Sequence, residues 1–162
     1  MTNRILLSLF LLVAVLSVGS IRSFESTVIN SQLSTAQLLG GSVANVNLNS
    51  ANTDNAITIT SPTTNYVVEA VFVKNKGTTA SLTTATAGLF TSTAGAGLAL
   101  AANQALSPIT ANAVNTDANG MALAITVGAR SWISSTTLQF RVGTAQGAAA
   151  TGDVYVYIRP IP

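Results

Sequence analysis

Cysteine and histidine are both absent from the 162-residue sequence. Without them the chain can form no disulfide, no zinc or copper site built from Cys and His, and no Ser-His or Cys-His catalytic pair. A G-x-S-x-G nucleophile turn is also missing. A serine–lysine pair would have to use Lys74 or Lys76, which lie just before the turn glycine Gly77 and are expected to be solvated. We therefore expect no enzyme, no cofactor and no small-molecule substrate.

Charged residues are scarce, at 7% of the chain against about 25% in an average soluble domain. Seven are basic and five acidic, and Lys74 and Lys76 are the one close basic pair. Nucleic-acid binding requires clustered Lys and Arg that displace counterions, so we expect none. A surface of Thr, Ser, Asn and Ala repels its own copies weakly, which favours assembly.

The five acidic residues are scattered singly, which disfavours the paired carboxylates of a glycosidase. Glu69 lies in an apolar stretch, where an unpaired charge is costly. We expect it to form a structural ion pair with Arg141, or alternatively with Arg130. Asp54 and Asp117 lie in Asn-containing loops whose oxygens could bind calcium. Asx turns account for the same residues, and we expect no metal.

An apolar run, ILLSLFLLVAVL, occupies residues 5–16, with Arg4 before it and small residues after it. This pattern is typical of a secretory signal peptide cut after Ser20. Even when it is extended to residue 18, the run is short for a bilayer span. The alternatives are a retained anchoring arm over residues 1–20 and a helix buried within an oligomer.

We expect the retained arm, a short hydrophobic helix. An exposed run of this kind aggregates in water, so lipid or protein must cover it. Ile5, Leu9 and Leu12 are the expected anchor residues. Contact of residues 5–18 with a membrane is one way in which the arm could be covered. Residues 21–162 are expected to form one β domain.

Short stretches with period-two alternation follow one another at about ten-residue spacing from residue 23 onward, joined by Gly, Asn and Thr turns. Tyr66 to Lys74 is the strongest, and its two apolar faces predict a central strand covered on both sides. Pro160 and Pro162 are expected to end strand pairing. The predicted fold is an all-β jelly roll or β-sandwich. The expected strands are 23–30, 43–48, 57–60, 66–74, 81–84, 88–91, 98–101, 121–127, 136–142 and 153–159.

Two segments compete with an all-β interpretation. Residues 34–41 predict a short helical turn, capped by Ser34 and ended by the glycine pair Gly40-Gly41. Ala99 to Ala105 is rich in alanine, although nearby glycines and Pro108 keep any helix there short.

Trp132 is the single tryptophan of the chain. Its ring could stack on a sugar or contact a neighbouring protein. We favour an anchor in the core or at the rim of an interface, because a lone tryptophan more often has that role.

Two phrases rich in Thr, Ala and Gly are LTTATAGLFT (residues 82–91) and TAQGAAATGDVYVY (residues 144–157). On these phrases the chain, from Tyr66 to its end, resembles a group of structural proteins of tailed phages. It implies a virion component on the capsid surface, a decoration or cement protein with a jelly-roll-like fold, which works as a homotrimer and binds a major capsid or other virion protein. The apolar N-terminus departs from that pattern. It leaves two alternatives to the capsid surface: a location in the tail or neck, or a virion that contains lipid.

The leading hypothesis is thus a phage structural protein without enzymatic activity. The alternative is a secreted or membrane-anchored bacterial binding domain, with residues 1–20 as signal or tether. Cleavage after Ser20 would favour secretion, and retention would favour assembly.

Overall fold

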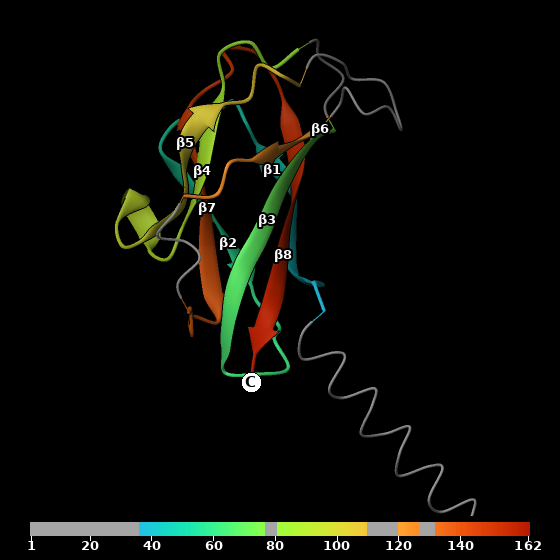
Figure 1. Ribbon diagram of the computed structural model, residues 1–162. Helices are drawn as coiled ribbons and strands as arrows, with labels where there is room; N and C mark the ends of the chain where they lie inside the picture. Colours follow the sequence, from blue (N-terminus) through green and yellow to red (C-terminus); the bar gives the residue numbers. More distant parts are fainter. Residues whose placement is uncertain (1–35, 77–80, 110–119, 127–131) are drawn as a thin grey trace, which may run out of the picture. The chain divides into compact units, whose positions relative to one another are not determined.

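The computed structural model describes residues 36–76, 81–109, 120–126 and 132–162 (Figure 1). The predicted arm, with Ile5, Leu9 and Leu12, and the predicted strand 23–30 lie outside the described residues. The unit from Gln37 to Pro162 is compact in itself. Its strands are β1 (Leu38–Asn47), β2 (Thr53–Thr58), β3 (Asn65–Asn75), β4 (Thr86–Phe90), β5 (Ala99–Ala105), β6 (Gly120–Leu123), β7 (Thr137–Thr144) and β8 (Thr151–Ile161), with one 3₁₀ turn, η1 (Thr93–Gly95).

These strands form two four-stranded antiparallel sheets, ordered β1-β8-β3-β6 and β2-β7-β4-β5. The all-β sandwich expected from the sequence is confirmed at this level. Within the sheets the first strand pairs with the last, the second with the seventh, the third with the sixth, and the fourth with the fifth. Most of the domain's sheet contacts therefore join segments that are far apart in the sequence.

Alternation along β7 and β8 builds the centre of the core. Val154, Val156 and Ile158 of β8 are fully buried, as are Leu138 and Phe140 of β7. The side chains between them on β8 are partly exposed, so the period-two prediction for both strands is confirmed. Complete burial of such a side chain contributes about 1.5–3 kcal/mol.

β3 is a central strand, as predicted, but its faces differ from the prediction. Glu69 lies at a β-bulge. Val68 is opposite Ile158 and Ala70 is opposite Tyr157, so Glu69 has no counterpart between these two consecutive residues of β8. The extra residue shifts the alternation by one position, since a bulge sets two residues against one on the partner strand. Side chains 66 and 68 before the bulge, and 71 and 73 after it, are buried, whereas Glu69 and Phe72 are exposed. The expectation that both faces are covered is wrong for these two side chains.

The predicted helical turn over residues 34–41 is wrong for its second half, because β1 begins at Leu38. Gly40 and Gly41 end no helix; they let β1 approach its neighbours closely. A Cβ on Gly41 would lie 2.3 Å from the carbonyl oxygen of Thr58. The Thr60 N–H also donates to the Gly40 carbonyl at 2.8 Å, which joins the two sheets along this side.

On the opposite side the segment after β6 joins the sheets. The Thr126 N–H donates to the Leu100 carbonyl on β5 at 2.9 Å, and its hydroxyl donates to Ala99. The stretch Ala99–Ala105 is strand β5, so the helical alternative is excluded. Residues 81–84, predicted as a strand, are not one.

Pro160 is predicted to end pairing, and this is wrong: it lies within β8, opposite Tyr66 of β3. The Tyr66 N–H and C=O point the other way and both bond to Ile133, each at 2.9 Å. Tyr66 and Pro160 are therefore a non-hydrogen-bonded pair, in which the missing N–H of proline costs no bond to β3. On the other side β1 begins opposite Ile158, two residues before Pro160.

Candidate functional site

The outward side of the β1-β8-β3-β6 sheet carries aromatic and apolar side chains. Register places Tyr157 of β8 beside Leu39 of β1, and Tyr155 of β8 beside Phe72 of β3. Leu39 is 53% exposed and Phe72 37% exposed, and both tyrosines are partly exposed. Directly opposed side chains have Cβ atoms about 4.5–5.5 Å apart. The four side chains therefore form one continuous band, called the outer face below.

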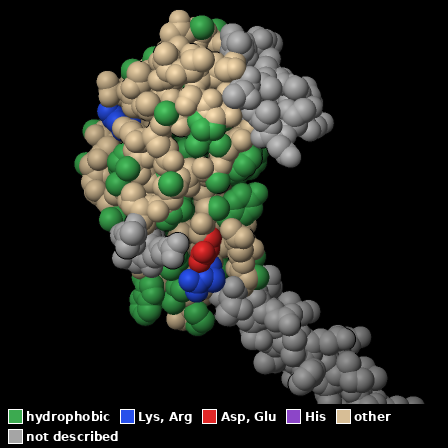
Figure 2. Space-filling view, turned by 45° about the horizontal axis from the view of Figure 1, so that its top comes forward, with side chains coloured by type: hydrophobic (Ala, Val, Ile, Leu, Met, Phe, Trp, Pro, Cys, Tyr) green, Lys and Arg blue, Asp and Glu red, His purple; other side chains and the backbone are tan. Residues whose placement is uncertain are grey.

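Ion pairs lie at both ends of the outer face along β8. Arg159 Nε donates to Glu69 Oε1 at 2.7 Å at one end. At the other end Lys76 Nζ lies 3.6 Å from Asp153 Oδ2. The centre of the face is thus apolar and aromatic, and its charges are balanced at the margins. Figure 2 shows one side of the molecule on which uncharged and hydrophobic side chains predominate and charged groups occupy only small spots.

The predicted ion pair between Glu69 and Arg141 is wrong. Glu69 pairs with Arg159, which follows from the β3–β8 register that sets Val67 opposite Arg159. Arg141 belongs to the other sheet, where it lies opposite Asp54. Arg130, the alternative partner, lies outside the described residues.

Asp54 is an ion-pair and capping residue. Both of its carboxylate oxygens accept hydrogen bonds from Arg141 Nη1, at 3.0 and 3.1 Å, and Oδ2 accepts a third from the Ala94 N–H at 2.8 Å. These donors account for the carboxylate without a metal. Asp117, the other calcium candidate, lies outside the described residues.

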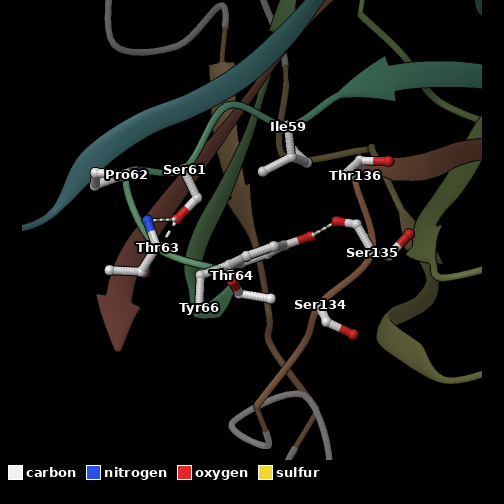
Figure 3. Close-up of a pocket in the computed structure, with 9 residues that line it drawn as sticks. All are labelled: Ile59, Ser61, Pro62, Thr63, Thr64, Tyr66, Ser134, Ser135 and Thr136. Atoms are coloured by element: carbon white, nitrogen blue, oxygen red, sulfur yellow. Dashed lines mark hydrogen bonds between the residues drawn. The ribbon is translucent and has the colours of Figure 1, made fainter. Parts of the chain in front are cut away.

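A pocket of about 400 Å³ lies between the β2–β3 connection and the segment that leads into β7 (Figure 3). Figure 3 shows the Tyr66 ring lying across it, with its hydroxyl directed to Ser135. That hydroxyl donates to the Ser135 carbonyl at 2.6 Å, and burial raises the pKa of Tyr66 to about 12. The other lining residues are small and uncharged: Ile59, Ser61, Pro62, Thr63, Thr64, Ser134, Ser135 and Thr136.

Trp132 lies two residues before Ser134 in the segment that borders this pocket. Its side chain is 71% exposed, so the expectation of a core anchor is wrong and a surface role remains. Ile133 between them is buried and forms a β-bridge with Tyr66. Trp132 and Ser134 therefore share the outward side of this extended segment.

The pocket is not predictable from the sequence. Its serine and threonine clusters, at 61–64 and 134–136, have the composition of ordinary turn and strand segments, and only the tertiary fold brings them together. A signal was present in the density of hydroxyl residues on either side of Pro62 and after Trp132. Such density is common throughout this chain and so could not single out these two clusters.

The described residues contain no group of three or more His, Cys, Asp or Glu side chains that could hold a metal ion. No helix among them is long and apolar enough to cross a bilayer. The part of the chain that the structure describes thus presents two candidate sites, an apolar outer face with charges at its margins and an uncharged, hydroxyl-lined pocket. Comparisons with protein-family models, with curated proteins and with solved structures found no match for this chain.

Proposed function

We propose that the chain is a non-enzymatic structural protein of a phage virion, which decorates or cements the capsid through contacts between copies of itself. The observation that carries this proposal is the pairing of first strand with last, second with seventh, third with sixth and fourth with fifth. This order results when one long antiparallel hairpin is rolled up into two sheets. It supports a jelly roll, an architecture that recurs in viral capsid proteins.

A fold by itself does not specify a function, so the surface has to support the proposal as well. Protein interfaces have an apolar centre enriched in aromatic residues and a polar rim. The outer face matches this anatomy, with Tyr155, Tyr157 and Phe72 at its centre and ion pairs at its ends. With only 7% charged residues, copies of the chain repel one another weakly at close approach.

In this proposal the functional unit is a homotrimer that binds a major capsid protein or another virion protein. Residues 1–20 anchor the unit, through protein contacts or through membrane contact of residues 5–18. The resemblance of residues 82–91 and 144–157 to phage structural proteins is a third support, after the strand order and the outer face.

Two measurements test the proposal. Purified virus particles from a culture that produces the protein are analysed by mass spectrometry, and we expect the full chain in copy numbers comparable to a capsid subunit. The mass of the full chain in solution is measured by light scattering after size exclusion, and we expect a trimer or larger assembly. Absence from the particles, together with a monomer that begins at residue 21, would contradict the proposal and favour an exported binding domain.

A further inference from the structure

We propose that the pocket beside Trp132 is a binding site for a neutral saccharide. Its volume of about 400 Å³ lies within the range of about 300–1,000 Å³ that is common for small-molecule sites. The inference rests on the walls of the pocket and is independent of where the protein resides.

The pocket has a fixed back wall. Tyr66 is almost completely buried; its hydroxyl bonds to the Ser135 carbonyl, and its backbone bonds to Ile133 in both directions. Ser135 Oγ in turn donates to the Thr137 carbonyl at 2.6 Å. These bonds hold the segment before β7 against β3, so the site is formed before any ligand arrives and ordering it costs little on binding.

Six Ser and Thr hydroxyls line the pocket besides that of Tyr66, and three of the six are engaged within the protein. Ser61 Oγ accepts from the Thr63 N–H at 3.3 Å, and Thr63 Oγ1 donates to the Asn65 carbonyl at 2.7 Å. Ser135 Oγ is engaged by the Thr137 carbonyl. The hydroxyls of Thr64, Ser134 and Thr136 make no hydrogen bond to another described residue, and all three residues are exposed. The free hydroxyls come from both sides of the pocket, Thr64 from one wall and Ser134 and Thr136 from the other (Figure 3).

The lining restricts the class of ligand. It contains no Asp, Glu, Lys or Arg, so a charged ligand would lose water without gaining an opposite charge. A purely apolar ligand would leave the hydroxyls of Thr64, Ser134 and Thr136 without water or partner, which is also costly. A sugar ring meets both conditions, because its hydroxyls exchange hydrogen bonds with Ser and Thr and its C–H groups can pack against the exposed Pro62 of the lining.

Trp132 supplies a second apolar surface next to the pocket. It projects on the same side as Ser134, and side chains two residues apart on an extended chain are about 6.6–6.8 Å apart. The Trp132 side chain is 71% exposed, so its indole ring is accessible to a ligand. A saccharide that fills the pocket and extends towards Trp132 would cover it by stacking.

The experiment uses Trp132 as its own probe, because it is the single tryptophan of the chain. The full chain is titrated with glucose, galactose, N-acetylglucosamine and their neutral disaccharides, and with sialylated and sulfated saccharides, while indole fluorescence is recorded. We expect a saturable change with at least one neutral saccharide and none with the charged ones. No response to any neutral saccharide, or equal responses to charged ones, would overturn the proposal.

Two variants locate the site. Thr64→Val and Ser134→Ala each remove one free hydroxyl with little change in shape, and each should weaken the binding several-fold to about tenfold. Thr93→Val in η1 is the matched control on another part of the surface and should bind as the unmodified chain does. Trp132→Ala, followed by calorimetry, should also weaken binding. Unchanged affinity in Thr64→Val, Ser134→Ala and Trp132→Ala would show that the saccharide binds elsewhere and would overturn the assignment.

Discussion

Asp54 and Arg141 face each other across β2 and β7 and form the most enclosed ion pair among the described residues, with both side chains less than a fifth exposed. Arg141 also donates from Nη2 to Asn52 Oδ1 at 3.0 Å, and Asp54 also accepts from the Ala94 N–H. The pair thus ties the β2–β7 edge of the sandwich to η1.

Asp54→Asn should lower the free energy of unfolding by about 1.5–3 kcal/mol, because hydrogen bonds to a charged group are lost at a partly buried site. The matched control is Glu69→Gln, which removes the exposed Glu69–Arg159 pair. Exposed pairs contribute about 0–1 kcal/mol, so this change should have little effect. Urea unfolding of both variants measures the difference. Equal losses would contradict the role assigned to Asp54.

Gly41→Ala should lower the free energy of unfolding by about 1–3 kcal/mol or more, since overpacking forces neighbouring atoms apart. The new methyl group would meet the Thr58 carbonyl at 2.3 Å and the Ile57 side chain at 2.8 Å. Ser42→Ala, at the next position and exposed, is the control and should be nearly neutral. A shift of the urea midpoint in Gly41→Ala with an unchanged slope identifies a loss of native stability. An unshifted midpoint would show that β1 and β2 do not approach so closely.

The stability of the domain should fall between about pH 10 and about pH 12 through Tyr66. Burial raises its pKa from 10.0 to about 12, so above pH 10 the unfolded chain releases this proton more readily than the folded chain. The contribution is complete below pH 10 and is lost as the pH rises through about 12. Unfolding free energies measured across this interval should decline more steeply in the unmodified chain than in Tyr66→Phe. Parallel declines would contradict the prediction.

Phe72→Ser should weaken self-association by removing an aromatic ring from the outer face. Leu98→Ser is the matched control, because Leu98 is 38% exposed against 37% for Phe72 and lies between β4 and β5, on the other sheet. Analytical ultracentrifugation over a dilution series measures both variants. We expect a higher dissociation constant for Phe72→Ser alone. If Leu98→Ser is the variant that dissociates, the interface lies on the β2-β7-β4-β5 sheet.

Self-association should depend little on salt. Few charges are present to be screened, and those at the margins of the outer face are already paired within the chain. Light scattering at about 0.05 M and about 1 M sodium chloride, a range over which the Debye length falls several-fold, tests this. Dissociation at high salt would mean that charge pairs between copies hold the assembly.

Strands whose alternation is unbroken were predictable from the sequence. On β7 and β8 each apolar residue in the pattern is buried, so periodicity alone located both strands and their inward faces. On β3 the same logic located the strand, but the alternation shifts by one position at Glu69 and leaves Glu69 and Phe72 exposed. The bulge at Glu69 depends on pairing with β8, and nothing in the local sequence marks it.

Ion-pair partners and the pocket could not be predicted without knowing how the strands pair. Glu69 and Arg141 look complementary in the sequence, yet they lie in different sheets, and each pairs with the residue that register brings near it. The pocket walls come from segments about 70 residues apart, which local patterns cannot join. Gly40 and Gly41 look like a helix end, but their small size serves the contact between β1 and β2.

The position of β8 between β1 and β3 has a consequence for synthesis of the protein. During translation β1 emerges early and has no sheet partner until the chain has reached residues 151–161, so nascent domains expose unpaired strand edges for most of their synthesis. Closure of contacts this distant in sequence is slow, and exposed edges on neighbouring ribosomes can pair with one another. Rapid completion of the last strand therefore limits the time in which nascent chains can pair wrongly with one another.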